Sequence, residues 1–188
     1  MIMNFNNNWT FRKEGDSAVP VCLPHDAMIL EKRDGSCRNG VNSGYFPGGK
    51  YVYEKTLEVA PEDIGKSIVI HFEGVYQNCS VVLNGKEVGS HKYGYTAFDV
   101  DISDVVRSGS NTLTVRVDNS LEPNCRWYSG SGIYRPVQLL IRDRVHIETV
   151  HIETLSYDPA AIKVDVTTTA HTPVTVELYD GDVQIASG

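Results

Sequence analysis

The stretch SIVIHFEGVYQNCSVVLNGKEVGS, residues 67–90, alternates apolar and polar side chains on both sides of an Asn-Gly pair. Ile68, Ile70 and Phe72 fall on one face of an extended segment, which is typical of a half-buried β-strand. The pair Asn84-Gly85 predicts a type I′ hairpin turn, because both residues tolerate positive φ. This stretch therefore predicts antiparallel β structure.

Similar alternation recurs in residues 51–59 and 112–118. The side chains expected on the buried face are Tyr51, Tyr53, Leu57, Val59, Leu113, Val115 and Val117. Helix-like patterns near residues 60–65 and 101–109 cover only about one turn each. Since no βαβ alternation is present, two antiparallel sheets packed face to face are the economical solution. We predict an all-β fold, a β-sandwich of jelly-roll type.

The pattern changes after Ile141. Residues 145–154, VHIETVHIET, repeat a pentapeptide, and an odd repeat sends its two apolar pairs to opposite faces of a strand. A bulge or corner near Thr149 would reconcile them, and chance is the other explanation for so short a repeat. Alternating segments that predict strands follow at residues 161–167 and 174–188, with Asp180-Gly181 opening a hairpin in the second. We predict a jelly-roll domain over 1–142 and a partial immunoglobulin-like sandwich over 143–188.

Composition limits the partners. The net charge is −7 and the 17 Lys and Arg residues are dispersed, so nucleic acid is not an expected partner. The N-terminus has no signal-peptide pattern and no segment is apolar enough to span a membrane, so we expect a cytoplasmic location and no membrane partner. The four cysteines lie far apart and are expected to be free thiols. No tight metal-ligand spacing occurs, and we expect neither metal nor cofactor.

Two glycine-rich segments resemble nucleotide-binding motifs and are rejected. Residues 44–50 fit G-x-x-x-x-G-K, but Tyr51 stands where a Ser or Thr binds magnesium, and Pro47 removes an N–H. Residues 130–135 begin like G-x-G-x-x-G, but Arg135 replaces the third glycine. We interpret both sets of glycines as loop residues.

Two other segments carry candidate site residues, LPHDAMILEKR over 23–33 and NCRWYSGSGIYR over 124–135. Their polar groups could bind sugar hydroxyls and their rings could cover sugar C–H groups; the candidates are His25, Asp26, Arg126, Trp127 and Tyr128. In the alternative interpretation, Trp127, Tyr128 and Tyr134 plug the end of the sandwich, and Arg126 pairs with a surface carboxylate.

Five segments together are similar to a known family: LPHD, SGYFPGGKYVYEK, FEGVYQNCSVVLNGKEVGSHKYGYTAFDVDIS, GSNTLTVRVDNS and RWYSGSGIYRPVQL. In this order they resemble the N-terminal sugar-binding domain of glycoside hydrolase family 2, which contains β-galactosidases, β-glucuronidases and β-mannosidases. The resemblance covers about residues 5–142. It implies a jelly roll followed by an immunoglobulin-like sandwich and a catalytic (β/α)₈ barrel.

The resemblance also implies that one domain cleaves the glycosidic bond and another helps to bind the sugar. The barrel supplies both carboxylates of a retaining mechanism, so we assign no catalytic residue to this chain and expect it to be inactive alone. Loops of the jelly roll reach over the barrel mouth, where Asp26 and Arg126 are candidates for contacts with sugar hydroxyls. Phe46 and Arg126 stand near positions where lac-operon-type enzymes have an Asn and acidic residues, so the shorter galactosidase-like members look closer.

The leading hypothesis is thus the sugar-binding portion of a retaining exo-β-glycosidase, most similar to β-galactosidases, with a terminal β-galactoside and the catalytic barrel as partners. An independent carbohydrate-binding module is the alternative, and a structural domain without a ligand is the third. The strands in 145–188 leave an apolar face and open edges, so we expect either a homodimer formed through these residues or a tail folded back onto the jelly roll.

Overall fold

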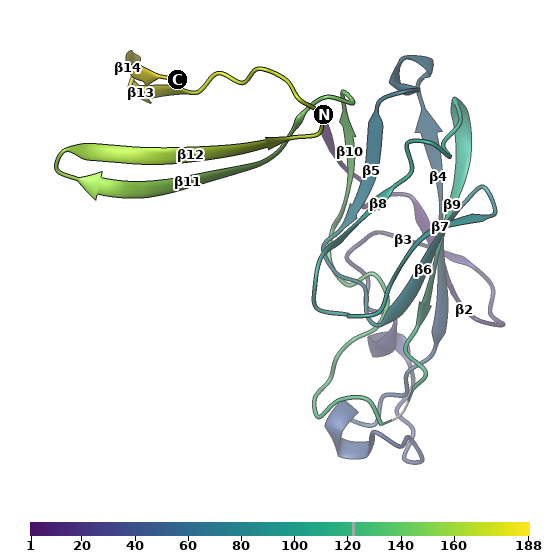
Figure 1. The fold of residues 1–188 in the computed structure, drawn as a ribbon. Helices are drawn as coiled ribbons and strands as arrows, with labels where there is room; N and C mark the ends of the chain where they lie inside the picture. Colours follow the sequence, from purple (N-terminus) through teal and green to yellow (C-terminus); the bar gives the residue numbers. More distant parts are fainter. Residues whose placement is uncertain (122) are drawn as a thin grey trace. The chain divides into compact units, whose positions relative to one another are not determined.

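The computed structural model describes residues 1–121 and 123–188, and it divides the chain into two compact units, Met1–Ile141 and Arg142–Gly188 (Figure 1). Within these described residues the chain has fourteen strands and three short 3-10 helices, which confirms the all-β prediction. No helix in the same residues is long and apolar enough to cross a membrane. Each unit is described separately below.

Unit 1 contains two sheets. The strands of the smaller sheet, in spatial order, are β1 (Ile2–Asn4), β10 (Val137–Arg142), β5 (Ser67–Phe72) and β8 (Phe98–Asp101). The strands of the larger sheet, in spatial order, are β3 (Val19–Val21), β2 (Trp9–Lys13), β4 (Lys50–Val59), β9 (Gly109–Asp118), β6 (Asn78–Leu83) and β7 (Lys86–His91).

The core of unit 1 lies between these sheets. Ile68, Ile70 and Phe72 of β5 are fully buried, as are Tyr53 of β4 and Val115 of β9 from the opposite sheet. Burial of each such side chain stabilises the fold by roughly 1.5–3 kcal/mol relative to exposure. The alternation read from the sequence therefore identified the buried faces of these strands.

Local turn chemistry also follows the sequence. Asn84 and Gly85 have φ of 51° and 83° and join β6 to β7, which confirms the predicted hairpin. All four cysteines are free thiols, as expected. Residues 44–49 lead into β4 and not into a helix, and a Cβ on Gly48 would lie 1.7 Å from the Asn119 carbonyl oxygen. Glycine at position 48 therefore allows the backbone to approach the backbone of Asn119 closely.

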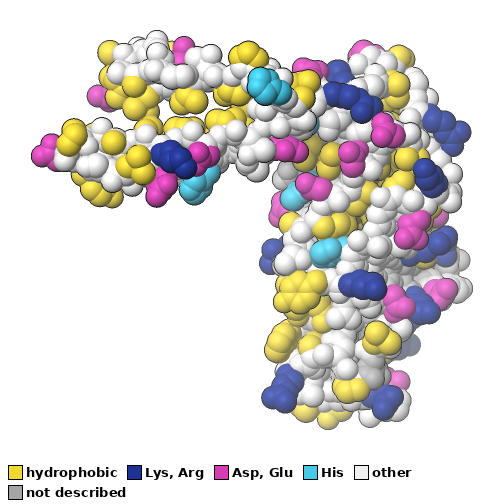
Figure 2. All heavy atoms as spheres, viewed as in Figure 1, with side chains coloured by type: hydrophobic (Ala, Val, Ile, Leu, Met, Phe, Trp, Pro, Cys, Tyr) yellow, Lys and Arg dark blue, Asp and Glu magenta, His cyan; other side chains and the backbone are white. Residues whose placement is uncertain are grey.

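Long loops gather at one end of unit 1 (Figure 1). The connection from β3 to β4 carries two 3-10 helices, η1 (Met28–Leu30) and η2 (Gly40–Ser43), and the connection from β9 to β10 begins at the same end. The third 3-10 helix, η3 (Pro61–Asp63), follows β4. In Figure 2, apolar side chains are visible among polar ones at the end that carries η1 and η2. This end contains all five predicted site residues.

Unit 2 consists of two hairpins. β11 (Ile147–Tyr157) pairs antiparallel with β12 (Ala160–Thr168), and its register shifts between Ile147 and Thr149, where a bulge was predicted. β13 (Glu177–Asp180) pairs with β14 (Val183–Ser187). The sequence predicted a strand from about residue 174, but β13 begins only at Glu177.

Large apolar side chains of unit 2 are exposed. Val150, Ile152 and Leu155 of β11 and Val183 and Ile185 of β14 each keep more than half of their surface in solvent. Apolar side chains of this unit are visible on its surface in Figure 2. The expected pairing of two copies through residues 145–188, and the immunoglobulin-like identity of this unit, stay predictions.

Gly132 offers a test of the packing in unit 1. Its φ is +93°, and a Cβ there would lie 2.0 Å from the Tyr53 hydroxyl oxygen. We expect Gly132→Ala to lower the free energy of unfolding by about 2–4 kcal/mol, from backbone strain and overpacking together. Urea unfolding followed by tryptophan fluorescence measures this, with Gly35→Ala as the control, since a Cβ there meets nothing within 4 Å. Equal stability of the two variants would contradict the prediction.

Candidate functional site

Asp26 ties together the two loops that carry the candidate residues. Its Oδ1 accepts hydrogen bonds from the backbone N–H of Met28 at 3.0 Å and of Ser131 at 2.9 Å. Its Oδ2 accepts a hydrogen bond of 2.6 Å from the Tyr128 hydroxyl. Hydrogen bonds to a carboxylate are stronger than those between neutral groups. Asp26 therefore holds loop 24–31 against loop 124–133.

His25 is placed beside Asp26 by both backbone and side chain. Its backbone N–H donates to the Ile133 carbonyl at 2.9 Å, and its Nδ1 lies 2.8 Å from the Tyr53 hydroxyl. Its ring also contacts Phe11, with ring centroids 4.5 Å apart. Burial lowers the pKa of His25, and the charge of Asp26 opposes that effect. The neutral ring can accept a hydrogen bond from Tyr53, so His25 links the loop to the core.

Hydrogen-bonded amide side chains hold the loop of residues 124–133 in place. Asn119 Nδ2 donates to Ser131 Oγ at 2.5 Å, and Asn124 Nδ2 donates to Asn119 Oδ1 at 2.5 Å. The Asn124 backbone N–H donates to Asn39 Oδ1 at 2.8 Å, which connects this loop with the segment around η2. Asn39, Asn119 and Ser131 are buried, and such satisfied networks fix loop geometry.

Four aromatic side chains, Phe46, Tyr95, Trp127 and Tyr128, form what we call the aromatic ledge. The Trp127 indole N–H donates to the Tyr95 hydroxyl at 2.8 Å, and the rings of Phe46 and Tyr128 meet edge to face at 5.6 Å. Trp127 is 56% exposed and Tyr128 38% exposed. Neither ring plugs the sandwich, so the structure contradicts the interpretation of Trp127 and Tyr128 as core residues.

Tyr134 differs from the ledge residues. It is half-buried, and its hydroxyl donates to the Gly94 carbonyl at 2.7 Å. Arg126 is exposed, and its guanidinium has no hydrogen-bond or ion-pair partner among the residues that the structure describes. The alternative pairing of Arg126 with a surface carboxylate is therefore not seen in that part of the chain.

The sequence interpretation missed Tyr95 and the supporting amides. The segment Tyr93-Gly94-Tyr95 places aromatic rings on both sides of a glycine, and a Cβ on that glycine would lie 2.1 Å from the Tyr76 ring. The two tyrosines that flank Gly94 were the sequence feature that could have indicated Tyr95 as a site residue. Across residues 1–121 and 123–188, no group of three His, Cys, Asp or Glu side chains could hold a metal ion.

The arrangement suits a polar ligand with apolar patches. Burial, and after it the hydrogen bond to Asp26, raises the pKa of Tyr128, so this hydroxyl stays protonated and donates a hydrogen bond to Asp26. The Tyr128 oxygen can then accept a hydrogen bond from a ligand, and Arg126 can donate. The exposed rings can cover C–H groups. Such a mixture of aromatic surface and a few polar groups is usual in ligand sites.

Comparison with known proteins gives the family of this site. Residues 43–143 match the family described as "Glycosyl hydrolases family 2, sugar binding domain". The chain belongs to glycosyl hydrolase family 2. It is 39% identical to a putative β-glucuronidase of Formosa agariphila over 82% of its own length, and 39% identical to a β-galactosidase of Bacteroides ovatus over 88%. It spans 16% and 21% of the lengths of these two proteins.

Solved structures of family 2 proteins share the fold. A β-glycosidase from Bacteroides vulgatus superposes with a TM-score of 0.86 at 27% identity, with all of this chain and 27% of that chain covered. A family 2 member from Bacteroides cellulosilyticus superposes with a TM-score of 0.84 at 29% identity, over 100% and 28% of the two chains. The chain thus corresponds to the N-terminal β-sandwich of family 2 β-glycosidases. The individual sugar contacts proposed for its residues stay predictions.

The His25 contact predicts a pH dependence of stability. The folded chain holds the pKa of His25 below its ordinary value of 6.5, so the unfolded chain binds more protons between the two values. The contribution of the buried, neutral His25 ring to the free energy of unfolding is full above pH 6.5. It decreases as the pH falls below that value. We expect wild type to lose more stability between about pH 7.5 and about pH 5 than His25→Gln. Urea unfolding at both pH values measures this, and identical losses would refute it.

Proposed function

We propose that this chain is the sugar-binding portion of a retaining exo-β-glycosidase that removes terminal β-galactosides. One observation carries the proposal: at the loop end of a family 2 sugar-binding domain, Asp26 ties two loops together through Tyr128, a member of the exposed aromatic ledge, and Arg126 on the same loop has no partner among the described residues. Loops held by a rigid sandwich are the usual carriers of ligand contacts. The exposed rings are available to a ligand.

Each side chain has a proposed role at this end. The Tyr128 oxygen accepts a hydrogen bond from a sugar hydroxyl, because its own O–H already donates a hydrogen bond to Asp26. Arg126 donates to another hydroxyl, and Trp127 covers the C–H face of the ring. Asp26 and His25 are positioning residues that hold the two loops in register. None of these residues forms or breaks the glycosidic bond.

The bond-breaking groups belong, in this proposal, to a barrel domain elsewhere in the parent protein. A retaining mechanism uses two carboxyl groups about 5–5.5 Å apart, one as nucleophile and one as acid and base. The jelly-roll loops would close one side of that site. Binding energy from such remote contacts improves catalysis by holding the sugar in the reactive position.

The terminal sugar has two candidates, because relatives of equal identity are named for different activities. The Bacteroides ovatus protein is named a β-galactosidase, and the Formosa agariphila protein is named a putative β-glucuronidase. We favour the galactoside, since the match to the former covers more of the chain. Nitrophenyl β-galactoside and β-glucuronide, assayed with the parent enzyme, separate the two. Faster turnover of the glucuronide would overturn the choice.

Tyr128 provides the sharpest test of the sugar contact. In the parent enzyme we expect Tyr128→Phe to lower kcat/KM about tenfold, which corresponds to one hydrogen bond of about 1.4 kcal/mol. Tyr45→Phe is the matched control, because Tyr45 is 42% exposed at the same end of unit 1. Steady-state assays and thermal melts on both variants decide the matter. A fall in stability without a fall in kcat/KM would make Tyr128 purely structural.

The isolated 188-residue chain provides a second test. We expect it to hydrolyse no nitrophenyl glycoside and to bind free galactose only weakly, because a few hydrogen bonds do not offset the entropy lost on association. Turnover above the buffer rate, abolished by a substitution in this chain, would contradict the proposal. Calorimetry that shows a micromolar dissociation constant would favour an independent carbohydrate-binding module.

A further inference from the structure

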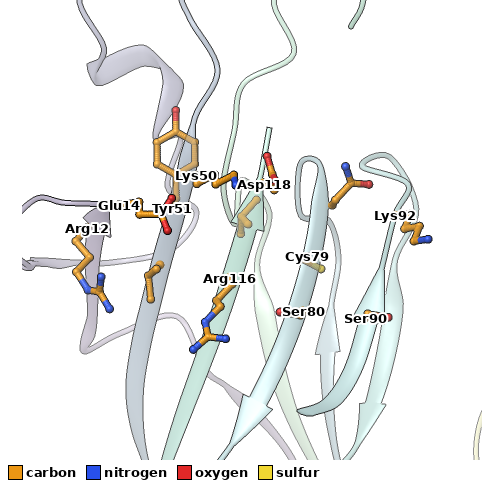
Figure 3. A pocket seen from close by; sticks show the side chains of 13 residues that line it. Arg12, Glu14, Lys50, Tyr51, Cys79, Ser80, Ser90, Lys92, Arg116 and Asp118 are labelled. Atoms are coloured by element: carbon orange, nitrogen blue, oxygen red, sulfur yellow. Dashed lines mark ion pairs between the residues drawn. The ribbon is translucent and has the colours of Figure 1, made fainter. Parts of the chain in front are cut away.

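The outer face of the larger sheet carries a second candidate site, which none of the predicted sugar contacts uses. An open hollow of about 590 Å³ lies over β2, β4, β9, β6 and β7 (Figure 3). The strand registers align one residue from each of these strands in a single row across the hollow. The row consists of Arg12, Val52, Arg116, Ser80 and Ser90.

The side chains of this row point away from the core. Their neighbours along the strands, such as Phe11, Tyr53 and Val115, are buried between the sheets. Because side chains alternate along a strand, Arg12 and Arg116 must lie on the opposite face. Figure 3 shows both guanidiniums projecting from that face, with one strand between them. Two strand spacings separate the arginines, a distance of about 10 Å.

The hollow is locally basic, although the chain as a whole has a net charge of −7. Its lining contains four cations, Arg12, Lys50, Lys92 and Arg116, and two carboxylates, Glu14 and Asp118. Asp118 pairs with Lys50 at 3.8 Å. In the described ranges 1–121 and 123–188, neither Arg12 nor Arg116 has a hydrogen-bond or ion-pair partner. Both guanidiniums keep their donors available.

Guanidinium donors select the chemistry of the ligand. A planar guanidinium binds carboxylate, sulfate or phosphate oxygens with two parallel hydrogen bonds. Between the arginines, Val52 provides a small apolar floor, and Ser80 and Ser90 continue the row with hydroxyl groups. Hydroxyls of this kind pair with the hydroxyls of a saccharide. The row thus offers contacts for oxyanions at its two arginines, for C–H groups at Val52 and for hydroxyls at its two serines.

We infer that this hollow binds an acidic oligosaccharide, with two of its oxyanion groups on Arg12 and Arg116 and its hydroxyls on Ser80 and Ser90. The saccharide part of this inference rests on the proposed function, whereas the oxyanion part rests on the arginine pair. The five strands of the row span about 19 Å, which suits a short oligomer better than a single sugar. The oxyanions can be uronate carboxylates or sulfate esters.

Binding to the 188-residue chain tests the inference. The probes are tetragalacturonate, its methyl ester as a neutral analogue, a sulfated neutral tetrasaccharide and inorganic sulfate. Titrations followed by calorimetry and by amide chemical shifts report affinity and location. We expect tetragalacturonate or the sulfated tetramer to bind and to shift amides of β2, β4, β9 and β6. The methyl ester should bind at least tenfold more weakly, and about 1 M salt should weaken the acidic probe.

Variants assign the binding to the two arginines. Arg12→Gln/Arg116→Gln should weaken the acidic tetramer at least tenfold, with unchanged thermal stability because both side chains lie outside the core. The control Arg107→Gln/Arg135→Gln removes the same charge from exposed positions outside the hollow and should bind like wild type. A preference for one acidic tetramer identifies the oxyanion as carboxylate or sulfate.

Three results would overturn the inference: no binding of either acidic tetramer, equal binding by both double variants, or binding of inorganic sulfate as tight as that of the tetramers. The last would leave a simple anion site. These titrations involve no hydrolysis. They can therefore fail while the parent enzyme still cleaves galactosides, and they can succeed even if it does not.

Discussion

The pairing of β4 with β9 is the constraint on which unit 1 depends. These strands are in register over ten residue pairs, from Lys50 with Asp118 to Val59 with Gly109. Because side chains alternate, every second residue of both strands enters the space between the sheets. The larger sheet is assembled around this pair, with β2 on one side and β6 on the other. A slip of one residue would turn the apolar faces outward.

The loop end is built outward from this buried pair. Tyr53 of β4 is fully buried, yet its hydroxyl reaches His25 at 2.8 Å. The same hydroxyl leaves no room for a Cβ at position 132, so the chain must cross there as glycine. Asp26, next to His25, then fixes Tyr128 and the backbone of Ser131. The position of Tyr128 in the aromatic ledge thus depends, through Asp26 and its neighbour His25, on a core side chain.

The parts of the fold that depend on neighbours in sequence were predictable. The Asn84-Gly85 turn and the register shift between Ile147 and Thr149 follow from positive φ and from the odd repeat, both local features. The site was predictable only as residue types. Asp26 and Tyr128 were both proposed as ligand contacts, but their mutual hydrogen bond joins positions 102 residues apart. Nothing in the sequence shows that Asp26 holds a loop.

The same limit explains why the outer row of the sheet was missed. Arg12 and Arg116 lie on strands that are not neighbours in sequence, and each looks like an ordinary solvent-facing residue of an alternating strand. Only the registers through Val52 show that they share a row. A pattern within one strand predicts which face a side chain takes. It does not predict which side chains of other strands stand beside it.

The loop end of unit 1 and the outer face of its larger sheet differ in how much a substitution at a proposed ligand contact should change the stability of the fold. At the loop end, His25 and Asp26 support the fold and lie beside the proposed contacts, so a substitution there changes both. On the outer face, Arg116 lies between Val115 and Val117, which are buried, while its own side chain is exposed. Its identity can therefore change without disturbing the core. A substitution of Arg116 should therefore change the proposed ligand contact while the packing between the sheets stays the same.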